Sequence, residues 1–297
     1  MEMAEESFGL RKEAYTMQAV LNYKAIDRTL RIVVTLILAL LAILYIFPLL
    51  WMISSAFKFE IDVLEFPIRL IPKRVNLNNF TVIFTDKEFI QYYINSIKVT
   101  SLSIIGNLTF ASLAGYAFAR LRFKGRDAIF LIYIAMMMIP IQVTILPKYL
   151  IFSNLGLTNT HYALILPEMF SVFTTFLLRQ NFIGIPYEFN EAGLIDGASQ
   201  TQIFTHLILP LAKPGIMTAT ILSFTWIWND YLNPLVFLSS TNKLTLTVGL
   251  HRFQESFSSN NALIMAGATI SLIPVILVFV SLQKYFIESF ASSGIKG

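Results

Sequence analysis

The chain has 297 residues, of which 56% are hydrophobic and only 13% are charged. Soluble domains carry about 25% charged residues, so this composition is that of a membrane protein. The sequence contains no cysteine, which excludes disulfides, thiolate metal sites and cysteine nucleophiles. His161, His206 and His251 stand far apart, so no metal site is expected. The net charge of +4 is modest and no basic run alternates with aromatic residues, so no nucleic-acid binding is expected either.

Six apolar stretches follow a charged, partly amphipathic arm over residues 1–31, which is predicted to rest on the cytoplasmic membrane surface. The first stretch is too long for a signal-peptide core and has no clear cleavage site, so it is predicted to be an uncleaved span. The pattern predicts an all-α polytopic membrane protein with a transmembrane domain over 32–283 and a cytoplasmic tail over 284–297. The predicted spans are 32–57, 89–118, 128–151, 160–178, 214–238 and 262–282. The prolines expected to kink these helices are Pro140, Pro147 and Pro274.

The positions of Lys and Arg predict which ends of the spans face the cytoplasm. The arm carries five basic residues, and the segment 120–126 places four in seven positions. Cytoplasmic loops of membrane proteins are enriched in Lys and Arg. We therefore predict that both termini, the segment 120–126 and the segment 186–214 lie in the cytoplasm. The large loop over 58–90 is itself basic, so the arm and the segment 120–126 decide the orientation.

The segment 186–214 is the longest polar interruption between apolar stretches in the second half of the chain. Gly197 permits a turn of positive φ after Asp196, and Ser199 with Gln202 fits a capping box. The pattern predicts two short helices around this turn, the second ending before a proline at position 210. A simple connection between two spans needs no such construction. We interpret the segment as a docking element.

Its sequence also resembles a known motif. Residues 191–198 read EAGLIDGA, and Phe204, Leu207, Leu209 and Pro210 follow. This spacing resembles the EAA loop of permease subunits of bacterial ABC importers, which usually has alanine at the position of Gly193. Other segments resemble the carbohydrate-importer branch, and within it the six-span subunit similar to the second maltose permease. These segments are 136–149, 224–238, 246–250 and 285–297.

The resemblance implies a subunit that takes up a sugar or oligosaccharide across the cytoplasmic membrane of a prokaryote. It implies a homologous second permease, a cytoplasmic ATPase dimer and an extracytoplasmic solute-binding protein as partners, with membrane lipid around the spans. ATP and Mg²⁺ would be bound by the ATPase; this chain has no P-loop motif and no catalytic constellation, so no enzyme activity and no cofactor of its own are expected. The residues assigned to ATPase coupling are Glu191, Ala192, Gly193, Asp196, Gly197, Ala198, Phe204 and Pro210.

The roles of single residues in the docking segment leave alternatives open. Glu191 and Asp196 can form charge-assisted hydrogen bonds to a partner, or they can only cap local helices. Contact with a partner is the favoured interpretation for Glu191, whereas both remain open for Asp196. Gly197 is assigned a structural role, and Gly193 is expected to loosen the first short helix while leaving the turn intact.

Polar residues within the predicted spans are candidates for a substrate path, because ionisable groups in a membrane are costly and usually face a cavity or a partner. Trp226, Asn229 and Asp230 combine an aromatic ring, which can stack on a sugar, with groups that bond hydroxyls. The alternative, which we favour, is that Asn229 and Asp230 satisfy each other or a neighbouring helix near the outer interface, with the tryptophans of this segment in the aromatic belt.

Glu168 is the other charged candidate, since the resemblance predicts an apolar or small residue there. It can contact cargo, pair with Lys98, or lie in a wetted part of the cavity. Asn107 and Gln142 can also contact cargo, but hydrogen bonding between helices is the commoner use of such residues.

Three other functions are weighed against an importer permease for sugars. A stand-alone secondary transporter needs an ion-coupling cluster and matched broken helices in two halves, and the sequence shows neither. An intramembrane enzyme needs a catalytic pair within the spans, and none is visible. The closest alternative is an ABC permease for a non-sugar solute such as a polyol phosphate. Basic residues in the large outer loop suit an anionic uronide or an acidic binding-protein surface: Arg69, Lys73 and Arg74.

Overall fold

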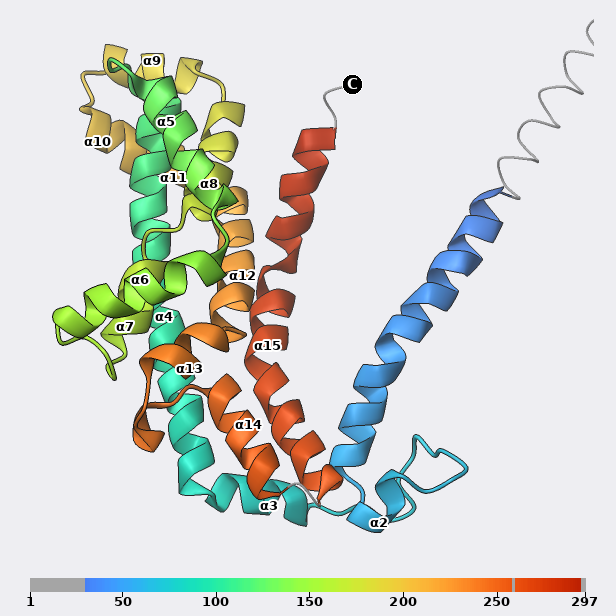
Figure 1. The fold of residues 1–297 in the computed structure, drawn as a ribbon. Coiled ribbons are helices and arrows are strands. Elements are labelled where there is room, and N and C mark those ends of the chain that lie inside the picture. Colours follow the sequence, from blue (N-terminus) through green and yellow to red (C-terminus); the bar gives the residue numbers. More distant parts are fainter. Residues whose placement is uncertain (1–29, 258–259, 295–297) are drawn as a thin grey trace, which may run out of the picture.

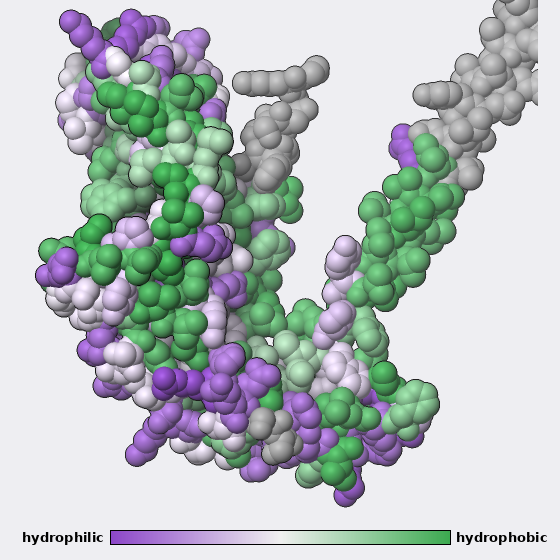
Figure 2. All heavy atoms as spheres, in the orientation of Figure 1, coloured by the Kyte–Doolittle hydropathy of each residue, from purple (hydrophilic) through white to green (hydrophobic). Residues whose placement is uncertain are grey.

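The computed structural model describes residues 30–257 and 260–294. Within these ranges the chain is helical and contains no strand, which confirms the predicted all-α class. Most of the arm predicted over 1–31 lies outside the described residues. Figure 2 shows hydrophobic residues over the middle of the molecule and hydrophilic residues at its two ends, which is the surface of a protein that crosses a bilayer.

The first helix, Leu30–Ala56, stands apart from the other helices (Figure 1). No residue of its most apolar window is buried, and side chains such as Leu36, Leu40 and Leu44 are exposed. In Figure 1 it runs from the end of the molecule at which α15 ends to the opposite end. A helix this apolar is stable only when lipid or another protein surrounds it.

The connection that follows is ordered by two short helices. These are α2 (Glu60–Val63) and α3 (Asn78–Thr85). The buried Asn79 of α3 donates from Nδ2 to the carbonyl of Ala56 at 2.9 Å and to the carbonyl of Lys58 at 3.0 Å. One side chain thus satisfies two carbonyls left open at the end of the first helix.

The second and third spans differ in shape. α4 (Lys87–Arg120) is continuous over 34 residues and agrees with the span predicted over 89–118. The third span is broken: α5 (Arg126–Ala135) with the 3-10 turn η1 (Met136–Met138) meets α6 (Ile141–Asn154) at 99°.

The break in the third span replaces the kink expected at Pro140. A proline disfavours helical backbone in the residue before it, and Ile139 is indeed extended, with φ −84° and ψ 116°. Pro147 stays inside α6. The span predicted over 128–151, interrupted at both prolines, is therefore two helices nearly at right angles, with the break at the first proline alone.

The fourth and fifth spans are also divided. α7 (Tyr162–Glu168) and α8 (Val172–Gly184) form the fourth, which extends beyond the predicted 160–178. α12 (Lys213–Trp228) ends well before the predicted limit of 238. A separate helix, α13 (Leu232–Phe237), follows, and the carboxylate of Asp230 accepts the backbone N–H of Asn233 in its first turn at 3.2 Å. The fifth span is thus shorter than predicted.

The last part of the chain is mainly one long helix. The turn η3 (Thr241–Lys243) and α14 (Leu246–Ser256) precede α15 (Asn261–Gly294), which contains Pro274. α15 continues to Gly294, so the described part of the tail predicted over 284–297 is helical. Between position 284 and that glycine the sequence contains neither glycine nor proline to end a helix.

Four described helices are long and apolar enough to cross a membrane. Two bent pairs bring the number to six when each is taken as one broken span. The second of these pairs joins residues 200–211 to α12 at 75°. α4 contacts α7, α8, α12 and α14, so it is the helix around which the other spans pack.

The junction at Asn79 yields a prediction. Asn79→Ala leaves two carbonyls without a donor and should lower the stability of the purified protein by about 1–3 kcal/mol. Asn78→Ala is the matched control, because Asn78 is exposed and its side chain makes no hydrogen bond to the described chain. Thermal unfolding in detergent measures both; equal midpoints for the two variants would contradict the assignment.

Candidate functional site

The segment 186–214 folds into a helical hairpin at one end of the molecule (Figure 1). We call residues 188–211 the helical hairpin. It consists of α9 (Glu188–Ile195), α10 (Gln200–Gln202), the π-helical turn η2 (Ile203–Ile208) and α11 (Leu209–Leu211). This is the two-helix arrangement that the sequence predicts.

The turn of the hairpin has the predicted chemistry. Gly197 has φ +76°, in the left-handed region, and the N–H of Ala198 bonds back to the carbonyl of Gly193 at 2.9 Å. Ser199 forms the predicted capping box: its Oγ accepts the N–H of Gln202 at 3.3 Å, and its own N–H donates to Oε1 of Gln202 at 2.8 Å. Local side chains therefore fix the turn.

The second half of the hairpin does not end before Pro210, where the sequence predicts a stop. The helix continues through Pro210 to Leu211, and the six residues before it are wound as a π-helix. In an α-helix the proline ring collides with the carbonyl four residues earlier. A wider π turn moves that carbonyl away from the ring. Pro210 therefore marks a change of winding.

Gly193 is the point where the two halves of the hairpin touch. It is buried, and a Cβ built there would lie 2.8 Å from Cγ1 of Ile203 and 3.1 Å from Cδ1 of Leu207. The structure corrects the expectation that this glycine loosens α9. The absent side chain lets α9 pack closely on η2, and this contact offsets the low helix propensity of glycine.

The outer face of the hairpin presents groups without a partner. Glu191 and Asp196 are exposed, and no described residue donates a hydrogen bond to either carboxylate or forms an ion pair with it. The capping role considered for the Asp196 side chain is thus not seen among the described contacts. Ile195 is 85% exposed, and Ala192 and Leu194 are exposed beside it. Apolar side chains with free charges around them are typical of a docking surface.

The inner face of the hairpin is packed on α4. Phe204 is buried, and its ring centroid lies 4.8 Å from that of Tyr116. The phenolic oxygen of Tyr116 donates to Oε1 of Gln200 at 3.1 Å and accepts from Nδ2 of Asn190 at 3.3 Å. Phe204, which the sequence assigns to ATPase coupling, therefore belongs to the anchor and not to the outer face. Ala198 is half-buried.

Sequence reasoning missed the anchor residues on α4. Arg120, one turn beyond Tyr116, is buried and donates to the last carbonyls of α8. From the sequence it was one of four basic residues that indicated topology. The spacing of four between an aromatic and a basic residue at the end of a span is the one available signal, since it places both on one face of a helix.

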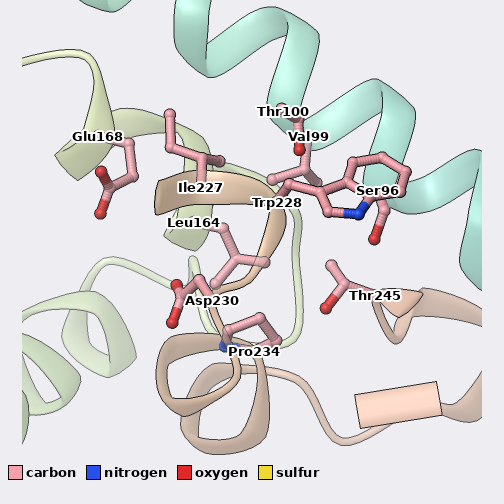
Figure 3. A pocket seen from close by; sticks show the side chains of 10 residues that line it. All are labelled: Ser96, Val99, Thr100, Leu164, Glu168, Ile227, Trp228, Asp230, Pro234 and Thr245. Atoms are coloured by element: carbon pink, nitrogen blue, oxygen red, sulfur yellow. The ribbon is translucent and has the colours of Figure 1, made fainter. Parts of the chain in front are cut away.

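A second cluster of polar groups lies where the fourth and fifth spans are broken (Figure 3). The sequence predicts Glu168 and Asp230 for the substrate path, and both line this pocket. The space is about 10 Å³, enough for a single water and too small for a sugar. The lining residues are Ser96, Val99, Thr100, Leu164, Glu168, Ile227, Trp228, Asp230, Pro234 and Thr245.

Asp230 is used for structure in this conformation. Its carboxylate accepts the N–H of Asn233 at 3.2 Å and Nδ2 of the same residue at 2.8 Å. Oδ1 of Asn233 in turn accepts from Nζ of Lys148 on α6 at 3.0 Å. Asn229 and Asp230 do not bond each other: Asp230 bonds the neighbouring helix α13 through Asn233, which is the other form of the favoured alternative, and Asn229 donates to the carbonyl of Thr225 on its own helix at 2.8 Å.

The charged neighbours of Glu168 also differ from those expected. Glu168 is half-buried, and the charges that act on it are those of Asp230 and Lys148. Lys98 is exposed and forms no ion pair with Glu168. Trp226 is 68% exposed and lines no part of the pocket, which agrees with the alternative of an aromatic belt.

The two amides assigned to the path have different environments. Asn107 is buried and joins helices, as its commoner use predicts: Nδ2 donates to the carbonyl of Glu168 at 2.7 Å, and Oδ1 accepts from Ser223 at 3.4 Å. Gln142 is exposed on α6, outside the cluster. In the described ranges no group of three or more His, Asp or Glu side chains is arranged to hold a metal ion.

Comparison with known proteins decides the family. The family described as "Binding-protein-dependent transport system inner membrane component" matches residues 107–291. The chain belongs to this family. The matched residues include the helical hairpin and most of the polar pocket, and the resemblance to importer permeases is confirmed.

Several relatives of this permease-family chain match it over most of their length. It is 34% identical to the arabinooligosaccharides transport system permease of Halalkalibacterium halodurans, over 87% of this chain and 94% of the relative. It is 31% identical to the galactooligosaccharides transport system permease of Bacillus subtilis, over 88% and 94%. A solved bacterial ABC transporter involved in the import of the acidic polysaccharide alginate contains a chain that is 27% identical, with a TM-score of 0.78, over 88% and 97% of the two chains.

The turn of the hairpin yields a prediction about Gly197. Gly197→Val should destabilise the hairpin by about 1–2 kcal/mol, because a β-branched residue is strained at positive φ. Gly197→Asn should cost much less, since asparagine tolerates this region. Limited proteolysis of residues 186–214 in the purified permease compares the two variants. Equal cleavage rates would show that the turn imposes no such constraint.

The hydrogen bond from Asn233 to Asp230 yields a second prediction. Asp230→Ala should lower the stability of the permease by about 1 kcal/mol, because the N–H of Asn233 in the first turn of α13 loses its acceptor. Asp230→Asn keeps an acceptor for the N–H of Asn233 and should retain most of that stability. Thermal unfolding midpoints distinguish the variants; an asparagine variant as unstable as the alanine variant would argue that the charge itself is required.

Proposed function

We propose that this chain is a permease subunit of an ABC importer that takes up a sugar or oligosaccharide delivered by an extracytoplasmic binding protein. The observation that carries the proposal is the outer face of the helical hairpin. It is a short, well-braced structure whose exposed carboxylates and apolar side chains have no partner in the described chain. In an importer, this face contacts the cytoplasmic ATPase, which binds and hydrolyses ATP with Mg²⁺.

The build of the hairpin suits transmission of movement. Its turn is held by a capping box and a glycine of positive φ, and its inner side is packed on α4. A braced element passes a displacement to the helices behind it, whereas a flexible loop absorbs it. Closure of the ATPase on its nucleotide would thereby change access to the path between the spans.

A second permease subunit completes the path in this proposal. The helix Leu30–Ala56 has no buried residue in its most apolar window and stands away from the bundle (Figure 1). A homologous subunit offers an apolar surface for such a helix, with lipid covering the remainder. The described start of this helix and the end of α15 both lie at the same end of the molecule as the hairpin, which supports the assignment of both termini to the cytoplasm.

The names of the relatives support a sugar cargo over a polyol phosphate. Relatives at 34% and 31% identity are permeases for arabinooligosaccharides and galactooligosaccharides. The basic residues of the outer loop give less support to an anionic uronide than the sequence alone does. Lys73 forms an ion pair with Glu65, and the guanidinium of Arg74 lies 5.7 Å from the ring centroid of Phe59.

The proposal is tested with the whole transporter. A tag on this chain should co-purify a second permease and an ATPase. Vesicles containing the complex, supplied with the binding protein and ATP, should accumulate labelled arabino- or galactooligosaccharides. Accumulation of glycerol 3-phosphate in place of both sugars would overturn the cargo assignment. Uptake by this chain alone, without ATP, would overturn the importer assignment.

The docking face yields a prediction. Glu191→Lys reverses a charge on this face and should weaken contact with the ATPase by about 1–3 kcal/mol, roughly ten- to hundredfold in affinity. Glu255→Lys is the matched control: it makes the same change at an exposed residue of α14, at the opposite end of the molecule. Co-purification and ATP-dependent uptake measure the effect. Equal uptake in both variants would contradict the assignment of the docking face.

A further inference from the structure

We propose that Tyr116 of α4 is the positioning residue that joins both halves of the helical hairpin to the transmembrane helices, with Arg120 fixing the helix that leads into it. This inference rests on the proposed function, because it concerns what lies behind the docking face. It is carried by the contacts on the inner side of the hairpin.

One hydroxyl group connects three helices. Tyr116 donates to Oε1 of Gln200 in α10 at 3.1 Å and accepts from Nδ2 of Asn190 in α9 at 3.3 Å. Asn190 is buried, and Tyr116 is 5% exposed. The ring of Tyr116 also packs against Phe204 at 4.8 Å and Phe182 at 6.2 Å between centroids. Removing the oxygen breaks both hydrogen bonds between Tyr116 and the hairpin, while the ring contacts remain.

Arg120 fixes the segment just before the hairpin. It is 6% exposed, and Nη2 donates to the carbonyls of Phe182 and Ile185 at the end of α8. Its guanidinium carbon lies 5.7 Å from the ring centroid of Tyr187. A cation at the C-terminus of a helix is stabilised by the carbonyls exposed there. The start of the hairpin is thereby held by α4 as well.

These contacts make α4 the route from the hairpin to the broken spans. In sequence the hairpin is attached to α8 and α12, but polar contacts attach it sideways to α4. The same helix carries Ser96 and Thr100, which line the polar pocket, and Asn107, which bonds the carbonyl of Glu168. A displacement of the hairpin therefore reaches the break between α7 and α8 through one continuous helix.

The test measures communication between the two sides of the membrane. The assembled transporter is placed in lipid nanodiscs, and its ATP hydrolysis is measured with and without the purified binding protein. Tyr116→Phe should reduce the stimulation by the binding protein about tenfold or more, since both hydrogen bonds between Tyr116 and the hairpin are lost. Tyr133→Phe is the matched control. The hydroxyl of Tyr133 in α5 bonds Thr175 of α8 at 3.2 Å and makes no contact with the hairpin, so its loss should leave the stimulation unchanged.

A second measurement separates positioning from general stability. Gln200→Ala removes one acceptor, and combined with Tyr116→Phe it should add little to the loss caused by Tyr116→Phe alone. Thermal midpoints of the two Tyr→Phe variants should be similar while their stimulation differs. If both variants lose stability alike and keep stimulation, the contacts of Tyr116 with the hairpin serve stability alone and the inference is overturned.

The outcome also distinguishes this inference from the proposed function. Loss of stimulation in Glu191→Lys with normal stimulation in Tyr116→Phe would overturn the role inferred for Tyr116. The proposed contact of the outer face of the hairpin with the ATPase would stand. If the wild-type chain co-purifies no ATPase and shows no stimulation by the binding protein, the proposed function is overturned, and with it the role inferred for Tyr116.

Discussion

Helices that break inside a membrane leave backbone groups that no bulk water can satisfy, and the structure depends on how side chains meet them. Three spans of this protein are broken or end early, at positions 139–140, 169–171 and 229–231. Ser171 and Asp230 accept the N–H groups of the helices that start there, and Asn107 donates to the carbonyl of Glu168. These three polar residues of the interior are explained by this requirement.

The requirement changes how polar residues in the spans are interpreted. An acidic residue near tryptophans suggests a sugar site, yet Asp230 bonds the first turn of α13 and Trp226 is exposed. Glu168 differs, because its carboxylate has no hydrogen-bond donor among the described residues and lines the pocket at the break of its span. The pocket is closed to about the volume of one water, so in this conformation Asp230 serves the structure and no sugar reaches Glu168 through it.

The helical hairpin, in contrast, leaves polar groups on its outer face without a partner among the described residues. Its inner side is bonded to α4 through Tyr116, Asn190 and Gln200, while its outer carboxylates and Ile195 have no partner among the described residues. An element that is rigid behind and unsatisfied in front is suited to receive a partner without deforming. In the function proposed here, this arrangement connects a cytoplasmic ATPase with the path through the membrane.

Composition and local pattern predict the class, the approximate spans and the local chemistry of the hairpin. Hydropathy, the capping box at Ser199 and the turn at Gly197 act within a few residues, so they can be recognised without a structure. The interruption at Pro140 is also predicted from the sequence, whereas the passage of a helix through Pro210 is not, because a π turn accommodates that proline.

The pairing of polar groups by hydrogen bonds depends on how the helices pack. Tyr116 and Gln200 are 84 residues apart, and Lys148 and Asn233 are 85 apart, so no local pattern records either contact. The role of Gly193 was likewise invisible, since it depends on the distance to Ile203 across the turn. Local backbone preferences are written in neighbouring residues, whereas a side-chain partner is chosen by how distant helices pack.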